Sequence, residues 1–210
     1  MSAKTRFIVA SSIAAAALAA SAACARRVDW APASVCSEAV PPTLAAPAGN
    51  ELAFELSAEG VQVYKCLEAG DGGMVAGAPA WSFDAPEATL FTRRGVYAGR
   101  HGAGPTWEGR DGSRVVATKV GSATSDRLAI PALLLRATSH PGGGGSMADV
   151  TFVQRVATWG GNAPSDGCSA DTVGAIARVP YHAVYCFYRR REEQAAASPH
   201  GAFSGGAPLR

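Results

Sequence analysis

Three residues near the middle of the chain have the types that acid–base chemistry needs. His101 is followed by Glu108 and Asp111, and an imidazole beside a carboxylate is a common general acid–base pair. The histidine also stands next to glycine at the end of an expected strand, where such a residue usually serves a turn or the surface. We therefore keep a small extracellular enzyme that uses His101 with Glu108 or Asp111 as an alternative, and we favour a role without catalysis.

Polar and aromatic side chains on several expected strands offer contacts to a small ligand. Arg136 can bind a carboxylate through two parallel hydrogen bonds, although a structural ion pair at a strand edge accounts for it equally well. Tyr181 and His182 lie on opposite faces of an aromatic strand, so one faces the core and the other is available to a planar or sugar-like ligand. Core packing explains Trp107 as readily as ligand contact does. The ligand-binding candidates are Trp107, Arg136, Gln154, Arg155, Tyr181 and His182.

The sequence lacks the motifs of hydrolases, phosphate-binding enzymes and metalloenzymes. Residues 144–148 approach the nucleophile elbow of α/β-hydrolases, but the motif ends in Ala148 and follows a glycine run instead of a strand. The glycine run at 142–145 has no Lys-Ser/Thr after it, and no histidine stands at zinc-ligand spacing from a cysteine. We therefore expect no metal and no cofactor.

The elements that must position these residues are expected to be short β-strands. The chain has 24 glycines and 13 prolines in 210 residues, too many turn-forming residues for a helical bundle. Alternating apolar and polar residues predict strands at 51–56 and 61–66. The predicted fold is all-β, a single-domain antiparallel β-sandwich over residues 51–188, with a closed or partly open β-barrel as the alternative. A Pro-rich extended arm at 26–50 and a disordered tail at 189–210 are expected to flank it.

Asp111-Gly112 gives the clearest turn signal. It lies between apolar strands at 106–108 and 115–118, and a two-residue Asp-Gly loop fits a type I′ turn because glycine accepts positive φ. This register predicts that Trp107 lies opposite Val116, an aromatic and β-branched pair that stabilises antiparallel strands.

Residues 1–25 have the three-part layout of a secretory signal peptide. A basic start with Lys4 and Arg6 precedes an apolar run over residues 7–20 and a stretch of small residues. The apolar run is shorter than the ~20 residues that span a bilayer, so we expect no membrane span and a secreted or periplasmic product. Cys24 raises the alternative of an envelope lipoprotein with a lipid anchor on that residue.

The expected signal peptide also decides the charge of the mature chain. The full chain has 19 basic and 17 acidic residues, and residues 1–25 contain two of the basic ones and no acidic one. The mature chain is therefore neutral. A neutral chain lacks the basic face that nucleic-acid binding needs, so we expect no nucleic-acid partner.

Four cysteines remain once the signal peptide is removed. In an oxidising compartment they suggest two disulfides, with three possible connectivities. We favour Cys66–Cys168, which closes a loop of about 100 residues and restricts the unfolded chain. The second favoured pair, Cys36–Cys186, joins the arm to the last strand. The alternative is that Cys36 or Cys186 is a free, buried thiol.

Several short strings occur together in one known family. They include Gly60-Val61-Gln62-Val63-Tyr64-Lys65-Cys66, Gly104-Pro105-Thr106-Trp107-Glu108, Gln154-Arg155-Val156, Gly160-Gly161-Asn162-Ala163-Pro164 and Val179-Pro180-Tyr181. Over roughly residues 40–188 the chain resembles the exported bacterial and fungal family catalogued as domain of unknown function 3455. The resemblance implies a single exported domain in which Cys66 and Cys168 hold the family's cysteine positions, with Cys36 and Cys186 as additions in this chain.

The resemblance brings no established activity and therefore no catalytic residue. Some fungal relatives bear a malate-dehydrogenase label, which this chain does not support because it lacks a βαβ unit with a G-x-G-x-x-G turn. The sequence thus predicts an exported β domain of the periplasm or extracellular space. Its expected role is structural or the binding of a small ligand.

Overall fold

The computed structural model describes residues 34–38, 40–68, 77–124 and 126–192. The expected signal peptide and most of the expected tail lie outside the described residues. Within them the chain is all-β, as predicted, and no helical segment among them is long or apolar enough to span a bilayer. The strands are β1 (Asn50–Leu67), β2 (Ala80–Phe91), β3 (Tyr97–Gly102), β4 (Thr106–Gly109), β5 (Arg114–Ala123), β6 (Ala132–Ser139), β7 (Val150–Gly160) and β8 (Ile176–Arg190).

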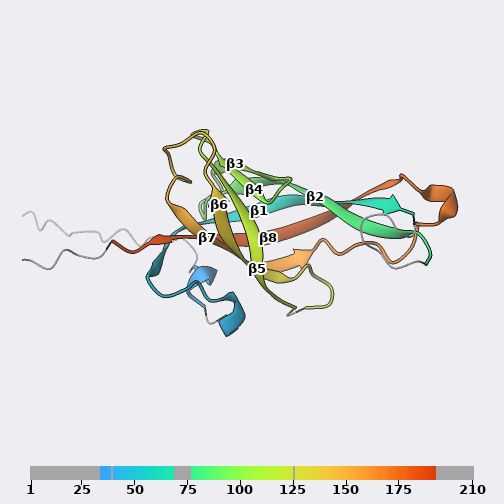
Figure 1. Cartoon of the computed structure of the whole chain (residues 1–210), viewed down its shortest axis with the longest axis horizontal. Helices are drawn as coiled ribbons and strands as arrows, with labels where there is room; N and C mark the ends of the chain where they lie inside the picture. The colour runs from blue at the N-terminus through green and yellow to red at the C-terminus, as the bar shows by residue number, and fades with distance from the viewer. Residues whose placement is uncertain (1–33, 39, 69–76, 125, 193–210) are drawn as a thin grey trace, which may run out of the picture. The chain divides into compact units, whose positions relative to one another are not determined.

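The described strands form one antiparallel sheet that closes on itself (Figure 1). Each strand pairs with the next, and β8 pairs with β1 from Asn50↔Arg190 to Lys65↔Ile176. The sheet is therefore a closed barrel, the alternative given above, and not the favoured sandwich of two packed sheets. The inward and outward alternation along a strand is the same in both architectures, so the pairing of β1 with β8 alone distinguishes them.

Local irregularities in β1 help the sheet to close. The pairing of β1 with β2 shifts register between Val63 and Tyr64, and such bulges bend a strand and increase its twist. Gly60 allows a close approach of the two strands, since a Cβ atom there would lie 2.1 Å from the Glu87 carbonyl oxygen. Both features let a long strand curve while it keeps its partners.

Alternate residues of the strands fill the interior of the ring. Tyr181, Tyr185 and Phe187 on β8 are buried, and Trp107 on β4 packs edge-on against Tyr185 and Phe187. Phe54 on β1 stacks on Phe187 with ring centroids 4.6 Å apart. Burial of these large aromatic rings is a major source of stability for the domain.

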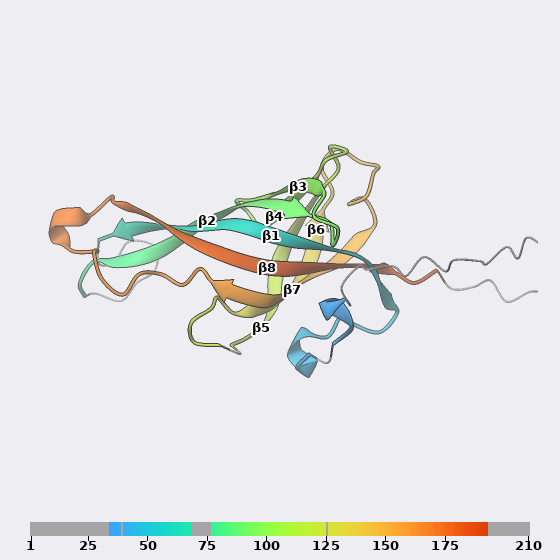
Figure 2. The ribbon, with the colours of Figure 1, turned by 180° about the vertical axis from the view of Figure 1, so that it is seen from behind.

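Three strands continue beyond the ring (Figures 1 and 2). The pairing of β7 with β8 ends at Gly160↔Tyr181, and β2 meets β3 only from Ala88 onward. The remaining parts of β1, β2 and β8 therefore pair only with one another. We call this three-stranded part the extension; it consists of residues 60–67, 80–87 and 176–180.

Both expected cysteine pairs lie at disulfide distance. The sulfur atoms of Cys66 and Cys168 are 2.02 Å apart, and those of Cys36 and Cys186 are 1.95 Å apart. The first pair joins β1 within the extension to the segment before β8. The second joins the segment before β1 to β8. The Trp81 indole N–H, which donates to the Asp166 carbonyl at 2.7 Å, adds a further tie at the extension.

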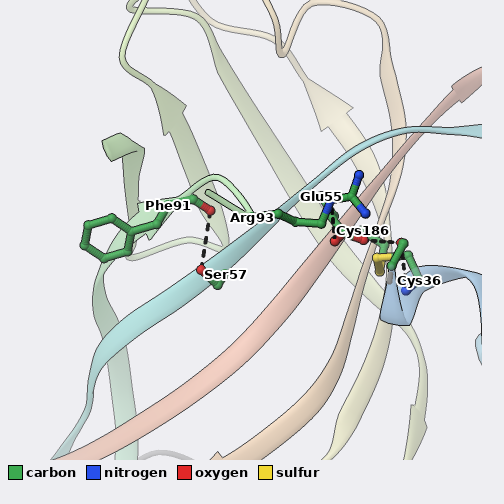
Figure 3. A network of polar contacts seen from close by, with 7 residues as sticks. Cys36, Glu55, Ser57, Phe91, Arg93 and Cys186 are labelled. Atoms are coloured by element: carbon green, nitrogen blue, oxygen red, sulfur yellow. Dashed lines mark hydrogen bonds and ion pairs between the residues drawn. A yellow bond between two sulfur atoms is a disulfide. The ribbon is translucent and has the colours of Figure 1, made fainter. Parts of the chain in front are cut away.

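The segment before β1 is held against the ring at two places. At the first, η1 (Val35–Ser37) carries the Cys36 disulfide, and the Ser34 hydroxyl donates to the Glu55 carboxylate on β1. Glu55 also forms an ion pair with Arg93 at 3.3 Å, so disulfide and ion pair lie side by side (Figure 3). The expected extended arm is thus folded back at this end.

At the second place, η2 (Pro42–Leu44) covers the outer face of β5 and β6. Leu44 is buried, and the Gln154 side-chain N–H donates to its carbonyl oxygen at 2.6 Å. A Cβ atom on Gly121 would lie 2.2 Å from the Thr43 carbonyl oxygen, so η2 requires glycine there. The arm therefore completes the outer surface of the ring at this point.

The β4–β5 hairpin differs by one residue from the expected register. Trp107 pairs with Val115 and not with Val116. The backbone N–H of Gly109 donates to the Ser113 carbonyl at 2.8 Å, which leaves three residues in the loop. The glycine of the Asp-Gly pair is the last of these, at φ 81°. Such a loop is typical of a type I turn followed by a bulge, whereas the expected type I′ turn has two.

Candidate ligand-binding cavity

A cavity of about 340 Å³ lies between the extension and the interior of the ring. Strand residues from both parts line it, together with the loop before β6. Its volume is within the usual range for small-molecule sites in proteins. The lining includes Gln62, Tyr64, Phe83, His101, Trp107, Ile130, Leu133, Leu135, Arg155 and Tyr185.

His101 is buried in an aromatic cluster on the cavity wall. Its ring stacks on Trp107 and contacts Tyr185 edge-on. The Nδ1 atom of His101 lies 2.9 Å from the Thr106 carbonyl oxygen, which can only accept, so Nδ1 carries the proton and Nε2 is an acceptor. Burial lowers the pKa of His101 to about 3. The ring is therefore neutral at neutral pH.

Two residues that line the cavity each have a buried N–H group with no hydrogen-bond partner within the described part of the chain. Gln62 is 2% exposed and Trp107 is 1% exposed, and the unpartnered atoms are Gln62 Nε2 and Trp107 Nε1. An unsatisfied buried donor costs about 1–3 kcal/mol. Both residues line the same cavity, so an acceptor placed there would remove this cost.

Arg155 brings a positive charge to the cavity from β7. Its Nε and Nη2 atoms donate to the Pro131 carbonyl oxygen at 3.1 and 2.9 Å. Among the ion pairs between described residues, none involves Arg155. Burial raises the pKa of Tyr64 and of Tyr185, and the charge of Arg155 opposes both shifts. Its field therefore acts on two tyrosines that line the cavity.

The structure brings some of the expected ligand-binding residues together. Trp107 and Arg155 both line the cavity. Tyr181 is buried beside it, with its hydroxyl oxygen 3.5 Å from that of Tyr185. On β8, Tyr181 thus belongs to the core face, and the exposed His182 belongs to the outer face.

The other candidates lie away from the cavity. Gln154 is buried beneath η2, where it donates to Leu44. Arg136 is exposed on β6. His182 lies beside the exposed Trp159 on the outer surface, with ring centroids 5.5 Å apart. These three side chains are therefore separated from the group around Trp107.

The acid–base candidates do not form hydrogen bonds with one another. Glu108 is exposed and pairs with Arg114 at 3.5 Å. Asp111 accepts hydrogen bonds from the backbone N–H groups of Ser113 and Ser146. The expected pairing of His101 with either carboxylate is thus not part of this geometry. Nor do the described residues contain a cluster of three His, Cys, Asp or Glu side chains able to hold a metal ion.

Sequence reasoning did not single out Gln62 and Tyr64, two polar residues that line the cavity. Gln62 lies between two valines of a predicted strand, where ordinary alternation places a polar side chain on the solvent face, so the sequence gives no signal that it is buried. Tyr64 could not be placed because the bulge beside it changes the face that it presents. Its hydroxyl donates to the Gly161 carbonyl at 2.6 Å, a contact between segments far apart in sequence.

The ring and its cavity coincide with a region shared with known proteins. The family model described as Protein of unknown function (DUF3455) matches residues 47–189, more than half of the chain. The chain belongs to the DUF3455 family. The DUF3455 region contains the cavity-lining residues together with Cys66, Cys168 and Cys186, while Cys36 lies before it. No curated protein and no solved structure matches the chain.

Proposed function

We propose that this DUF3455 protein is an exported small-molecule-binding protein that holds its ligand in the cavity between the extension and the ring. The observation that carries the proposal is that Gln62 and Trp107, two residues that line one cavity, each have a buried N–H group without a partner among the described residues. Buried donors without partners are rare in folded proteins, since each is costly. A ligand that accepts hydrogen bonds from these two N–H groups would explain why they have no partner in the protein.

The rest of the cavity wall has the composition of a binding site. Such sites are mainly apolar, with a few polar groups that orient the ligand. Leu133 and Leu135 supply apolar surface, and the stacked rings of His101 and Trp107 supply a wall with little freedom to move. A wall that is already ordered lowers the entropic cost of binding.

Two features support export. Residues 1–25 have the layout of a signal peptide. Two cysteine pairs at disulfide distance fit an oxidising compartment outside the cytosol. Together they favour the periplasm or the extracellular space as the place where the ligand is met.

The proposal is tested by native mass spectrometry of the protein purified from the exported fraction of its producing cells. We expect the wild-type protein to retain a low-mass compound that organic solvent releases. Leu133→Trp, which places an indole in the cavity, should lose that compound. Leu128→Trp is the matched control, because Leu128 is 81% exposed and does not line the cavity.

Two results would contradict ligand binding: a wild-type protein that retains no compound, and equal retention by Leu133→Trp. The intact mass tests export separately. A mature chain without the signal peptide is expected. A diacylglyceryl adduct on Cys24 would instead favour the envelope lipoprotein.

A further inference from the structure

The charge around the cavity is unbalanced towards positive. Arg155 is half-buried, and Lys119 also lines the cavity but is exposed. Asp84 is the one carboxylate among the described lining residues, and it is exposed to solvent. Charges at the surface are screened by water, whereas a half-buried charge interacts more strongly. The electrostatic field inside the cavity is therefore set mainly by Arg155.

The polar groups with free capacity on the inner wall are mostly donors. Gln62 and Trp107 each have a buried N–H group without a partner among the described residues. Arg155 has five N–H donors; Nε and Nη2 donate to the Pro131 carbonyl, and a side-chain hydrogen bond also links Arg155 to Tyr185, which leaves further N–H groups for a ligand. A carboxylate accepts several hydrogen bonds and carries the negative charge that Arg155 lacks as a partner. Because Arg155 is the cation on the inner wall, a ligand with a single negative charge would balance it.

The apolar part of the cavity wall favours an apolar portion in the same ligand. Ile130, Leu133 and Leu135 line the cavity, and two of them belong to the hydrophobic core. These side chains leave no hydrogen bonds for a sugar or a second charged group. Apolar surface of this kind favours a ligand with a hydrocarbon or aromatic body.

We propose that the cavity binds a small organic monoanion, with a carboxylate head held by Arg155, Gln62 and Trp107 and an apolar body against Leu133 and Leu135. This inference rests on the proposed function and adds the chemical class of the ligand. It makes Arg155 the residue that selects anions over neutral molecules of the same shape.

The experiment compares two pairs of probes that differ in charge but little in shape: benzoate with benzamide, and hexanoate with hexanamide. Binding to the full exported protein is measured by calorimetry and by ligand-observed NMR. We expect each carboxylate to bind about ten-fold more tightly than its amide, because charged hydrogen bonds are stronger than neutral ones. Arg155→Gln should remove this preference while amide binding changes little.

Two further variants serve as a control and as a substitute for Arg155→Gln. Arg136→Gln is the matched control, because Arg136 lies on the neighbouring strand β6 but is exposed and does not line the cavity. It should bind all four probes as the wild type does. Arg155→Lys is the substitute variant if Arg155→Gln fails to fold. It retains the positive charge, so it should retain most of the preference for carboxylates.

The outcomes separate the two proposals. Amides that bind as tightly as carboxylates would overturn the anion class and leave the small-molecule site in place. A preference that survives in Arg155→Gln and is lost in Arg136→Gln would also overturn it, since the selecting charge would then be elsewhere. No binding of any probe up to roughly ten-millimolar concentrations, at the weak limit of specific binding, would overturn the anion class and count against the cavity itself.

Discussion

His101 and Trp107 stack ring on ring, with centroids 4.4 Å apart and ring planes 8° apart. The pairing of β3 with β4 places the two residues directly opposite each other, so the sheet itself holds the stack in place. The histidine is neutral because it is buried, and it forms part of the wall of the cavity. Its protonation therefore affects the fold and the site together.

Acid should destabilise the fold through His101. The pKa of this residue is about 3 in the folded state and 6.5 ordinarily, so between these values the unfolded chain binds a proton that the folded chain does not. The contribution of the neutral His101 ring to the free energy of unfolding is complete above about pH 6.5. It is lost as the pH falls towards 3, by up to ~1.4 kcal/mol per pH unit. Urea unfolding of the wild type and of His101→Gln across this range measures the effect.

His101→Gln should flatten this part of the stability curve, while His182→Gln should keep it because His101 is still present. Equal slopes for the wild type and His101→Gln would show that His101 does not control the acid limb. The comparison depends on slopes, so a lower overall stability of either variant does not affect it.

Asp111 should contribute to stability at a lower pH. Hydrogen bonds from Ser113 and Ser146 hold the pKa of its carboxyl well below the usual range, so the contribution is present above about pH 4 and is lost as the pH falls further. Asp111→Asn should cost about 1 kcal/mol near neutral pH. Stability curves of the variant and the wild type, measured by urea unfolding, should converge in acid.

Gly121 should be required for the position of the arm. A Cβ atom there would lie 2.2 Å from the Thr43 carbonyl oxygen, so Gly121→Ala must displace η2 from β5. We expect a loss of about 1–3 kcal/mol and faster hydrogen exchange at the Leu44 amide, which now donates to Pro41. Gly102→Ala is the control, since a Cβ atom at Gly102 meets nothing within 4 Å. Unchanged exchange in Gly121→Ala would show that η2 is not seated as described.

Removal of the Cys66–Cys168 bridge should lower the free energy of unfolding by about 4–5 kcal/mol, because it constrains a long loop in the unfolded chain. The double variant Cys66→Ser/Cys168→Ser is compared with Cys36→Ser/Cys186→Ser by urea unfolding in oxidising buffer. Hydrogen exchange should then rise in the extension for the first variant and around η1 for the second. The same exchange pattern in both would contradict the separate roles of the two bridges.

The sequence indicates strands well and their closure poorly. Alternation along 51–56 and 61–66 predicts β1, and the Asp-Gly turn predicts the hairpin of β4 and β5. The pairing of β1 with β8 depends on contacts between residues more than a hundred positions apart. Such pairing leaves no local pattern, so the sandwich and the barrel cannot be told apart from residue types.

The cavity is predicted only in part for a similar reason. Trp107 and Arg155 were candidates because of their chemistry, and both line it. Gln154 has comparable chemistry but faces the opposite side of β7, where Leu44 covers it. Which of two neighbouring polar residues faces inward depends on register, and a one-residue shift reverses it. The hairpin, with its three-residue loop, shows how easily such a shift occurs.

The bridge between Cys36 and Cys186 has a mechanical consequence. It connects a residue before β1 to one in β8, near the two limits of the described region. A force that pulls on the two chain ends would pass through this covalent link and would bypass most of the chain between the two cysteines, which are 150 positions apart. The ring and its cavity would then stay folded under tension.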